Sequence, residues 1–292
     1  MQYSSKVERL KLKKYQTIAP SSRYWKPNID YKIALQKLLK DRIHDNDVIV
    51  ISEKAIATAS GRICDESKYK PSLLAKFLAI FWMRIVWGHI LAPFSRMSKD
   101  NISRLQQYPF KEGSSHKQVT LHYAGFLQSL RHGSEGGIDV TNLPYSYSCI
   151  PFVDPEIIAS EIRQYIEEIL DRNVDVMISD SDKTYSFFSF HLSPRKSCLK
   201  GVHCFGVIAF ILGRFFKLRP RSTPIAFTRK DKNPEEALRI AALSNRARGD
   251  GAGRTIWDVA ERFKVDITGV TWNMLESIPH YPVVIMRIST HA

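Results

Sequence analysis

The sequence predicts an α+β or mixed α/β fold in which helices flank mixed sheets. Segments with helical periodicity alternate with short apolar, β-branched runs along the 292 residues, which argues against a helix bundle and an all-β sandwich. The composition, with 44% hydrophobic and 25% charged residues, is that of a globular protein. We therefore expect one domain over residues 1–292, large enough to contain two intimately joined subdomains.

Charge and cysteine content narrow the range of functions. The formal net charge is +14 and the pI is near 9.6, so the protein attracts phosphate-bearing ligands such as nucleotides, nucleic acid or anionic lipid. A solvated basic surface without any such ligand has the same composition. The four cysteines are scattered, and Met1 to Gln16 lack the apolar core of a signal peptide. We therefore expect a cytoplasmic protein.

Four elements are expected at the start of the chain. Residues 7–15 alternate between charged and apolar side chains, which is typical of a strand with one exposed face. The proline-containing residues 17–27 indicate a loop. Asp30 is a candidate N-cap for a helix that runs to about Ile43. Residues 48–52, VIVIS, are a short β-branched run typical of a buried strand.

Residues 73–94 are the most hydrophobic segment of the chain. Their length approaches that of a membrane span. Lys76, Arg84 and His89 fall inside the segment, however, and each charge near a bilayer centre costs roughly 2.5–3.5 kcal/mol. We therefore favour a buried or half-buried helix, with a subunit interface as one setting for it. Peripheral membrane contact is the alternative.

The later elements follow from the same periodicities. Residues 98–130 have a polar helical pattern, with breaks expected at Tyr108-Pro109 and around Gly113. The helix that begins at Pro155 has isoleucines at helical spacing. The other expected elements are a strand-like stretch at 145–155, a buried strand at 174–182, an irregular stretch at 184–200, an apolar strand or helix at 206–216, a strand at 221–228, a helix from Pro234 to Gly249, and a strand at 280–288.

Residues 132–144, HGSEGGIDVTNLP, form the first candidate site. The glycine pair at 136–137 lets backbone approach another group, such as a phosphate, or adopt dihedral angles closed to other residues. Asp139, Thr141 and Asn142 then offer oxygen ligands and hydrogen-bond partners. An ordinary surface loop has the same composition. The prediction of a site here therefore depends on finding a second group of ligands elsewhere in the chain.

Asp180, Ser181 and Asp182 supply that second group, because they follow a buried strand. Ligands of α/β proteins bind most often at the carboxyl ends of strands. Hard oxygen ligands of this kind bind Mg²⁺ or Mn²⁺ together with phosphate oxygens. An Asx turn that closes the strand is the alternative. Together with Asp139, the sequence offers two acids from different segments, as a nucleotide–metal site requires.

Residues 248–254, RGDGAGR, are a glycine-rich loop that either cradles phosphate with backbone N–H groups or forms a helix C-cap and turn. Neither GxxxxGK[ST] nor a GxGxxG after a strand occurs in the chain. Cys198 and Cys204 have no spacing typical of zinc sites, even with the histidines nearby. No GxSxG motif marks a nucleophile.

Five segments, in this order, resemble the coenzyme F420-0:L-glutamate ligase (F420 γ-glutamyl ligase) family. GIDVTN together with ISDS is the most specific pair. The match extends over residues 48–182, and residues 183–292 match weakly. The segments are VIVISEKAIATASGR, KPSLLAKFLA, RHGSEGGIDVTNLP, IPFVDPEIIASEIR and VDVMISDSD.

The resemblance implies an F420 γ-glutamyl ligase-like fold and a GTP-dependent amide ligase. Such an enzyme adds L-glutamate through a γ-glutamyl link to coenzyme F420-0 or a related phosphorylated carboxylate, by way of an acyl phosphate. The implied cofactors are GTP and Mg²⁺ or Mn²⁺, with K⁺ as a further candidate, and the implied assembly is a homodimer. The implied metal ligands are Asp139, Asp180, Ser181 and Asp250, and the implied nucleotide contacts are Lys54, Asn142, Gly249 and Gly251.

The chain departs from the family pattern at several positions. Thr58 and Ser60 stand where the family has lysine and glutamate, and no arginine follows Asp182 until Arg195. The acceptor could therefore differ from the deazaflavin coenzyme. A second hypothesis is a catalytically altered family member that binds nucleotide or nucleic acid, and a third is peripheral membrane attachment through residues 73–94. As partners we expect substrates and a second copy, and neither nucleic acid nor a membrane.

Overall fold

A computed structural model describes residues 15–288 of the chain. Its strands are β1 Tyr15–Ile18, β2 Val48–Ser52, β3 Ile63–Asp65, β4 Tyr147–Cys149, β5 Asp175–Phe187, β6 Phe190–Ser193, β7 Val202–Cys204, β8 Arg219–Phe227 and β9 Val283–Ile288. Seven of them form a mixed sheet in the order β1-β9-β2-β5-β6-β7, with β8 paired to β5, while β3 and β4 form a separate pair.

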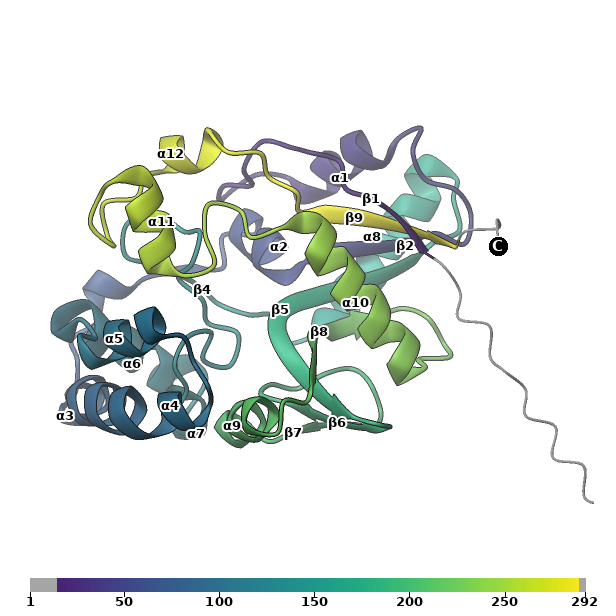
Figure 1. The fold of residues 1–292 in the computed structure, drawn as a ribbon. Helices are drawn as coiled ribbons and strands as arrows, with labels where there is room; N and C mark the ends of the chain where they lie inside the picture. The colour runs from purple at the N-terminus through teal and green to yellow at the C-terminus, as the bar shows by residue number, and fades with distance from the viewer. Residues whose placement is uncertain (1–14, 289–292) are drawn as a thin grey trace, which may run out of the picture.

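Helices surround this sheet, and a helical group made of α3 to α7 lies beside it (Figure 1). The fold class predicted from the alternation of helices and strands is confirmed. The helices are α1 Tyr31–Leu39, α2 Glu53–Ala59, the short 3-10 turn Glu66–Lys68, α3 Leu73–Phe77, the π-helical segment η2 Leu78–Leu91, α4 Ala92–Phe94, α5 Lys99–Gln106, α6 Phe110–Tyr123, α7 Phe126–Ser129, α8 Pro155–Leu170, α9 Val207–Phe215, α10 Pro234–Arg248, α11 Ile256–Phe263 and α12 Trp272–Glu276.

The central strand β2 has both faces covered. Its alternate side chains point to opposite sides of the sheet. Ile49 and Ile51 pack into a core with α1, α2 and α8, whereas Val48 and Val50 pack into a second core with α10. All four side chains are buried, which explains the uninterrupted apolar run in the sequence. The predicted buried strand at 48–52 is confirmed.

Capping residues define the helices on the two faces of the sheet. The side chain of Asp30 accepts hydrogen bonds from two backbone N–H groups in the first turn of α1, and that of Asn233 does the same for α10. Both helices are confirmed, although α1 ends at Leu39, four residues before the predicted end. Gly249 caps the C-terminus of α10 with a φ of 71°.

The strand expected at 174–182 is longer than predicted. β5 continues to Phe187 and pairs with β8 along most of its length. Thr184 and Ser186 are polar but buried, and Thr184 bonds to the Thr223 hydroxyl of β8. Because these polar side chains are paired inside the sheet, the prediction of an irregular stretch at 184–200 is wrong for residues 184–193. Residues 194–200 contain no helix or strand, as predicted. β6 returns from β5 through a tight turn at 188–189.

A bulge in β5 exposes the predicted site residues. Asp180 pairs with Thr223 and Lys183 pairs with Ser222, so Ser181 and Asp182 have no pairing partner in β8. The acids therefore lie in the middle of a bent strand and not at its end. Bulges of this kind redirect side chains and occur next to active sites.

Three other sequence predictions are modified by the structure. The stretch at 206–216 is a helix, α9. The N-terminal strand β1 begins at Tyr15 and extends into the predicted loop at 17–27, whereas residues 7–14 of the expected strand lie outside the described residues. Gly113 does not break the helical pattern, because it lies inside α6.

The hydrophobic residues 73–94 form one continuous helical segment of α3, η2 and α4, and Ser72 caps its start. One side packs with α5 and α9 through Ala79, Met83 and Trp87. The other side is exposed, which confirms the half-buried helix of the sequence prediction. In the described part of the chain it is the one helix long and apolar enough to cross a membrane, a criterion that core helices also meet.

Replacement of Gly113 by alanine should destabilise the protein. Alanine normally stabilises a helix interior by about 1 kcal/mol over glycine, but a Cβ at this position would lie 2.3 Å from the ring of Tyr108. We expect Gly113→Ala to lower the free energy of unfolding by about 1–3 kcal/mol in chemical denaturation. In a Tyr108→Ala background the same change should be neutral or stabilising. Equal losses in both backgrounds would refute the steric explanation.

Candidate functional site

Two cavities adjoin at the site. The larger lies between the sheet and the helical group, and the smaller is lined by α2, the bulge of β5 and the loop after α10. The smaller has a volume of about 290 Å³ and the larger about 560 Å³. Their linings share a wall, so a ligand in one cavity lies next to a ligand in the other. The residues common to both linings are Asp139, Thr141, Ser181, Lys183 and Arg254.

The smaller cavity collects every residue that the family resemblance implies as a metal ligand or nucleotide contact, whereas Asp182 lines only the larger cavity. The collected residues come from the start of α2, the loop before β4, the bulge of β5 and the loop after α10, which are far apart in sequence. These residues are Lys54, Asp139, Asn142, Asp180, Ser181, Gly249, Asp250 and Gly251. The structure therefore brings them together, although their chemical roles stay predictions.

Lys54 and Asp139 form an ion pair at the shared wall. Nζ of Lys54 lies 2.5 Å from Oδ2 of Asp139 and donates to the backbone carbonyl of Thr141 at 2.8 Å. Oδ1 of Asp139 accepts from the backbone N–H of Thr141 at 2.7 Å. The pair fixes the loop 139–142 against α2, and it places one cation and one anion at the position where both cavities meet.

Arg195 joins Glu53 and Asp180 in a buried cluster. One guanidinium nitrogen lies 2.6 Å from the Glu53 carboxylate and 2.7 Å from that of Asp180, and a second donates to Glu53 at 3.1 Å. Burial raises the pKa of Glu53 above its usual value. Burial acts in the same direction on Asp180, but the charge and hydrogen bond of Arg195, together with the Lys54 charge and a backbone hydrogen bond, outweigh it and hold the pKa of Asp180 below its usual value.

The glycine pair at 136–137 leaves room for the guanidinium of Arg195 and for the end of α6. A Cβ on Gly137 would lie 2.5 Å from a guanidinium nitrogen of Arg195, and one on Gly136 would lie 2.9 Å from Ala124. Both glycines also have positive φ. The expectation that the pair makes room for a phosphate is thus corrected, because Arg195 and the end of α6 take up the adjacent space.

Asp182 is paired in the same manner on the other side of the bulge. Its carboxylate lies 2.9 Å from a guanidinium nitrogen of Arg131, which also donates to the backbone carbonyl of Ser134 at 2.6 Å. Burial raises the pKa of Asp182 above its usual value despite Arg131. The sequence offered no signal for Glu53, Arg131 or Arg195 as site residues, because their partners are distant along the chain.

The side chain of Asn142 anchors the glycine-rich loop 249–253. Its Nδ2 donates to the backbone carbonyls of Asp250 at 3.2 Å and Gly253 at 3.0 Å. Its Oδ1 accepts from the backbone N–H of Ala252 at 2.8 Å. In this structure Asn142 therefore positions the loop through all its polar atoms.

The loop itself presents backbone and charge to the smaller cavity. Gly249 and Gly251 have φ values of 71° and 62°, which other residues rarely adopt. Asp250 pairs loosely with Arg254 at 3.6 Å, and both side chains are exposed. Arg248 is buried behind the loop, and burial lowers its pKa to about 10. The segment 248–254 therefore carries two cations, Arg248 and Arg254, and one carboxylate, that of Asp250.

The acids of the smaller cavity do not form a metal cage by themselves. Within residues 15–288, no three Asp, Glu, His or Cys side chains are grouped so that they could hold a metal ion. Asp139, Asp180 and Asp250 are each paired with a cation instead. Mg²⁺ is often bound by one or two carboxylates together with phosphate oxygens and water. The carboxylate and hydroxyl donors at this wall fit a divalent ion that arrives with a nucleotide.

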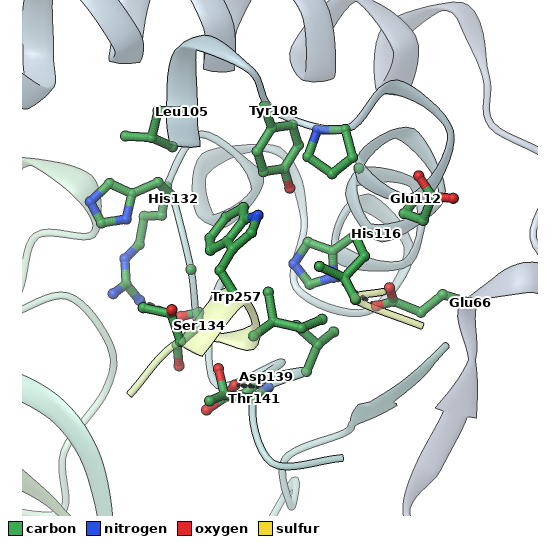
Figure 2. A pocket seen from close by; sticks show the side chains of 18 of the residues that line it. Glu66, Leu105, Tyr108, Glu112, His116, His132, Ser134, Asp139, Thr141 and Trp257 are labelled. Carbon is green, nitrogen blue, oxygen red and sulfur yellow. Dashed lines mark hydrogen bonds and ion pairs between the residues drawn. The ribbon is translucent and has the colours of Figure 1, made fainter. Parts of the chain in front are cut away.

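The larger cavity has an aromatic end and a polar end. Figure 2 shows Trp257 between Tyr108 of the helical group and the wall that carries Asp139 and Thr141. Phe210 of α9 also lines this cavity. A planar, partly apolar group can pack against these rings, while its polar substituents reach the shared wall.

A buried chain of charges supports the polar end of the larger cavity. His116 lies between Glu66 at 2.7 Å and Glu135 at 2.8 Å, and Nζ of Lys117 lies 2.6 Å from Glu135. Burial alone would lower the pKa of His116, but the two carboxylates raise it to about 10. His116 is therefore protonated at neutral pH and holds α6 against the loop 132–138.

Comparison with known proteins places these residues in a family context. The family model described as F420-0:Gamma-glutamyl ligase matches residues 26–189. A Methanocaldococcus jannaschii protein named "Uncharacterized protein MJ1361" is 32% identical over 257 residues, which cover 85% of this chain and 86% of the relative. The coenzyme F420:L-glutamate ligase of Archaeoglobus fulgidus is 26% identical over 153 residues, 51% of this chain and 53% of the relative.

Removal of the Arg195 charge should destabilise the fold. Arg195→Met leaves the carboxylates of Glu53 and Asp180 buried without a cation, and breaking a buried pair in this way costs about 3–5 kcal/mol. We expect that loss in urea denaturation at neutral pH. In a Glu53→Gln background the additional loss should be smaller by at least about 1 kcal/mol, because one of the two charges is already absent. Strictly additive losses would contradict the cluster.

Stability should depend on the protonation of His116. Its folded-state pKa of about 10 lies above the usual unfolded value of about 6.5. The stabilisation is therefore complete below pH 6.5 and is lost as the pH rises towards 10. His116→Gln should lower the free energy of unfolding by about 3 kcal/mol at pH 6. The difference between wild type and variant should shrink between pH 7 and 10, and a constant difference would refute this assignment.

Proposed function

The chain belongs to the F420-0:γ-glutamyl ligase family, and we propose that it is a GTP-dependent ligase that joins L-glutamate to coenzyme F420-0 or a related phosphorylated carboxylate. One observation carries the proposal. The residues that the family resemblance assigns to metal and nucleotide all line one cavity, which shares a wall with a larger, aromatic cavity. An enzyme that joins two substrates with the help of a third requires such adjoining sites.

The smaller cavity is the proposed nucleotide site. Its glycine-rich loop offers backbone N–H groups, and Lys54, Lys183 and Arg254 line it with positive charge. Such groups stabilise the negative charge of phosphate oxygens. Asp139, Asp180, Ser181 and Asp250 would hold Mg²⁺ or Mn²⁺ there. A divalent ion held there would supply positive charge that offsets the negative charge of the phosphates during phosphoryl transfer.

The larger cavity is the proposed acceptor site. Its aromatic end, with Tyr108, Phe210 and Trp257, suits the flat ring of a deazaflavin. The acceptor carboxylate would then lie at the shared wall, next to Lys183 and Arg254. The nucleotide phosphate and the acceptor carboxylate would meet at this wall, where the two cavities join.

The reaction would proceed in two steps across this wall. In the first, a carboxylate oxygen of the acceptor attacks the terminal phosphorus of GTP, the P–O bond to GDP breaks, and an acyl phosphate forms. In the second, the glutamate amine attacks the acyl carbon, the C–O bond to phosphate breaks, and the amine proton passes to solvent. Lys54 and Lys183 would stabilise the transferred phosphoryl group in both steps. The bonds formed are one acyl phosphate and then one amide.

A nucleotide-binding protein without ligase activity is the second candidate function. It is favoured by the ion pairs of Asp139 with Lys54 and of Asp180 with Arg195. A metal ion that binds these carboxylates would either displace the two cations or lie beside them. In that case GTP would bind in the presence of Mg²⁺ or Mn²⁺ without GDP release or product. The assay below separates the two functions.

The direct test is incubation of the full-length protein with GTP, MnCl₂, L-glutamate and coenzyme F420-0. We expect one GDP per glutamylated product, measured by chromatography and mass spectrometry. Asp139→Asn and Asp180→Asn should each lower turnover by roughly 100-fold or more, because changes even in groups behind metal ligands cost 10–100-fold. Chelation of the metal should abolish turnover.

Asp171→Asn is the matched control, because Asp171 is an exposed residue at the C-terminus of α8 and far from both cavities. It should keep full turnover, and all variants should unfold cooperatively. Absence of both product and GDP in the wild type would eliminate the ligase assignment. Normal turnover in Asp139→Asn and Asp180→Asn would eliminate the assigned metal ligands.

A further inference from the structure

An unusually apolar surface lies on the side of the molecule that carries the segment 73–94. We define this apolar face by the exposed side chains of three elements: the segment 73–94, the turn between β5 and β6, and α9. Leu73 and Phe188 are each 85% exposed and Phe216 is 62% exposed. Phe77, Phe81 and Ile208 are also exposed. Soluble monomers rarely leave so many large apolar side chains in water on one side.

The three elements adjoin one another, because α9 contacts both the segment 73–94 and the strands β5 and β6 that flank the turn. The rings of Phe94 and Phe215 stack with centroids 4.2 Å apart, which joins α4 to α9. The Arg214 side chain also donates to the backbone carbonyls of Ser95 and Arg96. In Figure 1, α3, α4, α9 and β6 lie along the same lower side of the molecule. The apolar face is therefore continuous from α3 to α9.

The segments that build the apolar face also carry the positive charge of the chain. Residues 67–99 and 183–230 contain 16 of the 43 Lys and Arg residues and none of the 29 Asp and Glu residues. The rest of the chain, with 27 basic and 29 acidic residues, is close to neutral. Some of these arginines pair with acids from elsewhere, as Arg195 does. Lys76, Arg96 and Lys217 are exposed within or directly after the apolar helices.

We propose that this apolar face docks the protein on the surface of an anionic lipid bilayer. Phenylalanine and leucine side chains enter the boundary between headgroups and acyl chains, while the surrounding lysines and arginines bind lipid phosphates. The attachment is peripheral, because Met83 and Trp87 of the same helical segment are fully buried against α5 and α9. The helix therefore lies along the membrane and does not cross it.

A second copy of the chain is the competing occupant, and the charge argues against it. In a two-fold interface the same patch meets itself, so Lys76, Arg96 and Lys217 would face their own copies across an apolar contact with no acid in either segment. Anionic headgroups instead supply the missing negative charge. Anionic lipid is thus the partner that satisfies both the apolar and the basic character of the face.

The test is flotation of the full-length protein with vesicles of phosphatidylcholine alone or mixed with phosphatidylglycerol. We expect binding to the mixed vesicles, weak binding to phosphatidylcholine, and release at high salt as charge is screened. The double variant Leu73→Ser/Phe188→Ser should bind at least roughly tenfold less, because two large side chains no longer enter the bilayer. Lys76→Glu/Arg96→Glu/Lys217→Glu should lose at least roughly tenfold as well.

The matched control is Val153→Ser/Ile157→Ser, which replaces two exposed apolar residues near the start of α8, outside the apolar face. This control should float like the wild type, and every variant should keep its thermal unfolding transition and its nucleotide-dependent turnover. No flotation of the wild type with anionic vesicles would overturn the proposal. A dimer of the 33.5 kDa chain in light scattering that Leu73→Ser/Phe188→Ser dissociates, with no vesicle binding, would assign the face to a second copy.

Discussion

The guanidinium of Arg195 connects the elements on which the site depends. It holds Glu53 at the start of α2 and Asp180 in the bulge of β5, and it occupies the space that Gly137 leaves open. Three segments that are distant in sequence are thus fixed relative to one another by one planar cation. Arginine suits this role because its fork of donors stays charged when buried and can bind two carboxylates. Without it, two acids would face each other in a low-dielectric interior.

The same principle extends across both cavities. Lys54 balances Asp139, and Arg131 balances Asp182. His116 and Lys117 together balance Glu66 and Glu135. The site is therefore preorganised by ion pairs before any ligand arrives, and two further cations, Lys183 and Arg254, line the wall shared by the two cavities. The charged side chains are already desolvated and held in place by their ion-pair partners when a phosphate enters. They therefore need to move little when it binds.

Local patterns were sufficient to predict much of this fold, and the family motifs indicated which side chains would lie together. β2 follows from its β-branched run, α10 from Pro234 and Gly249, and the gathering of Asp139 with Asp180 from the order of the family motifs. Tertiary contacts decided the rest. Buried polar residues such as Thr184 continue β5 because β8 supplies their partners.

The features that the sequence did not predict correctly share one physical cause. Gly113 stays helical because the ring of Tyr108 packs against it, and Arg195 became a site residue because Glu53 lies beside it. In both cases the deciding partner comes from another part of the chain, so no periodicity within a short window contains the information. Neighbouring residues encode caps and buried strands, whereas long-range contacts encode how a glycine or an arginine is used.

Helix α9 has a different environment on each of its two sides. Phe210 lines the larger cavity, and Ile208, the second residue of the helix, is exposed on the apolar face. An α-helix is only about 10 Å across, so a single helical layer separates the outer surface from the cavity. Gly213 makes that layer thin, since the ring of Tyr185 from β5 rests directly on its backbone. A small tilt of α9 would therefore move both of its sides at once and change the width of the cavity beneath it.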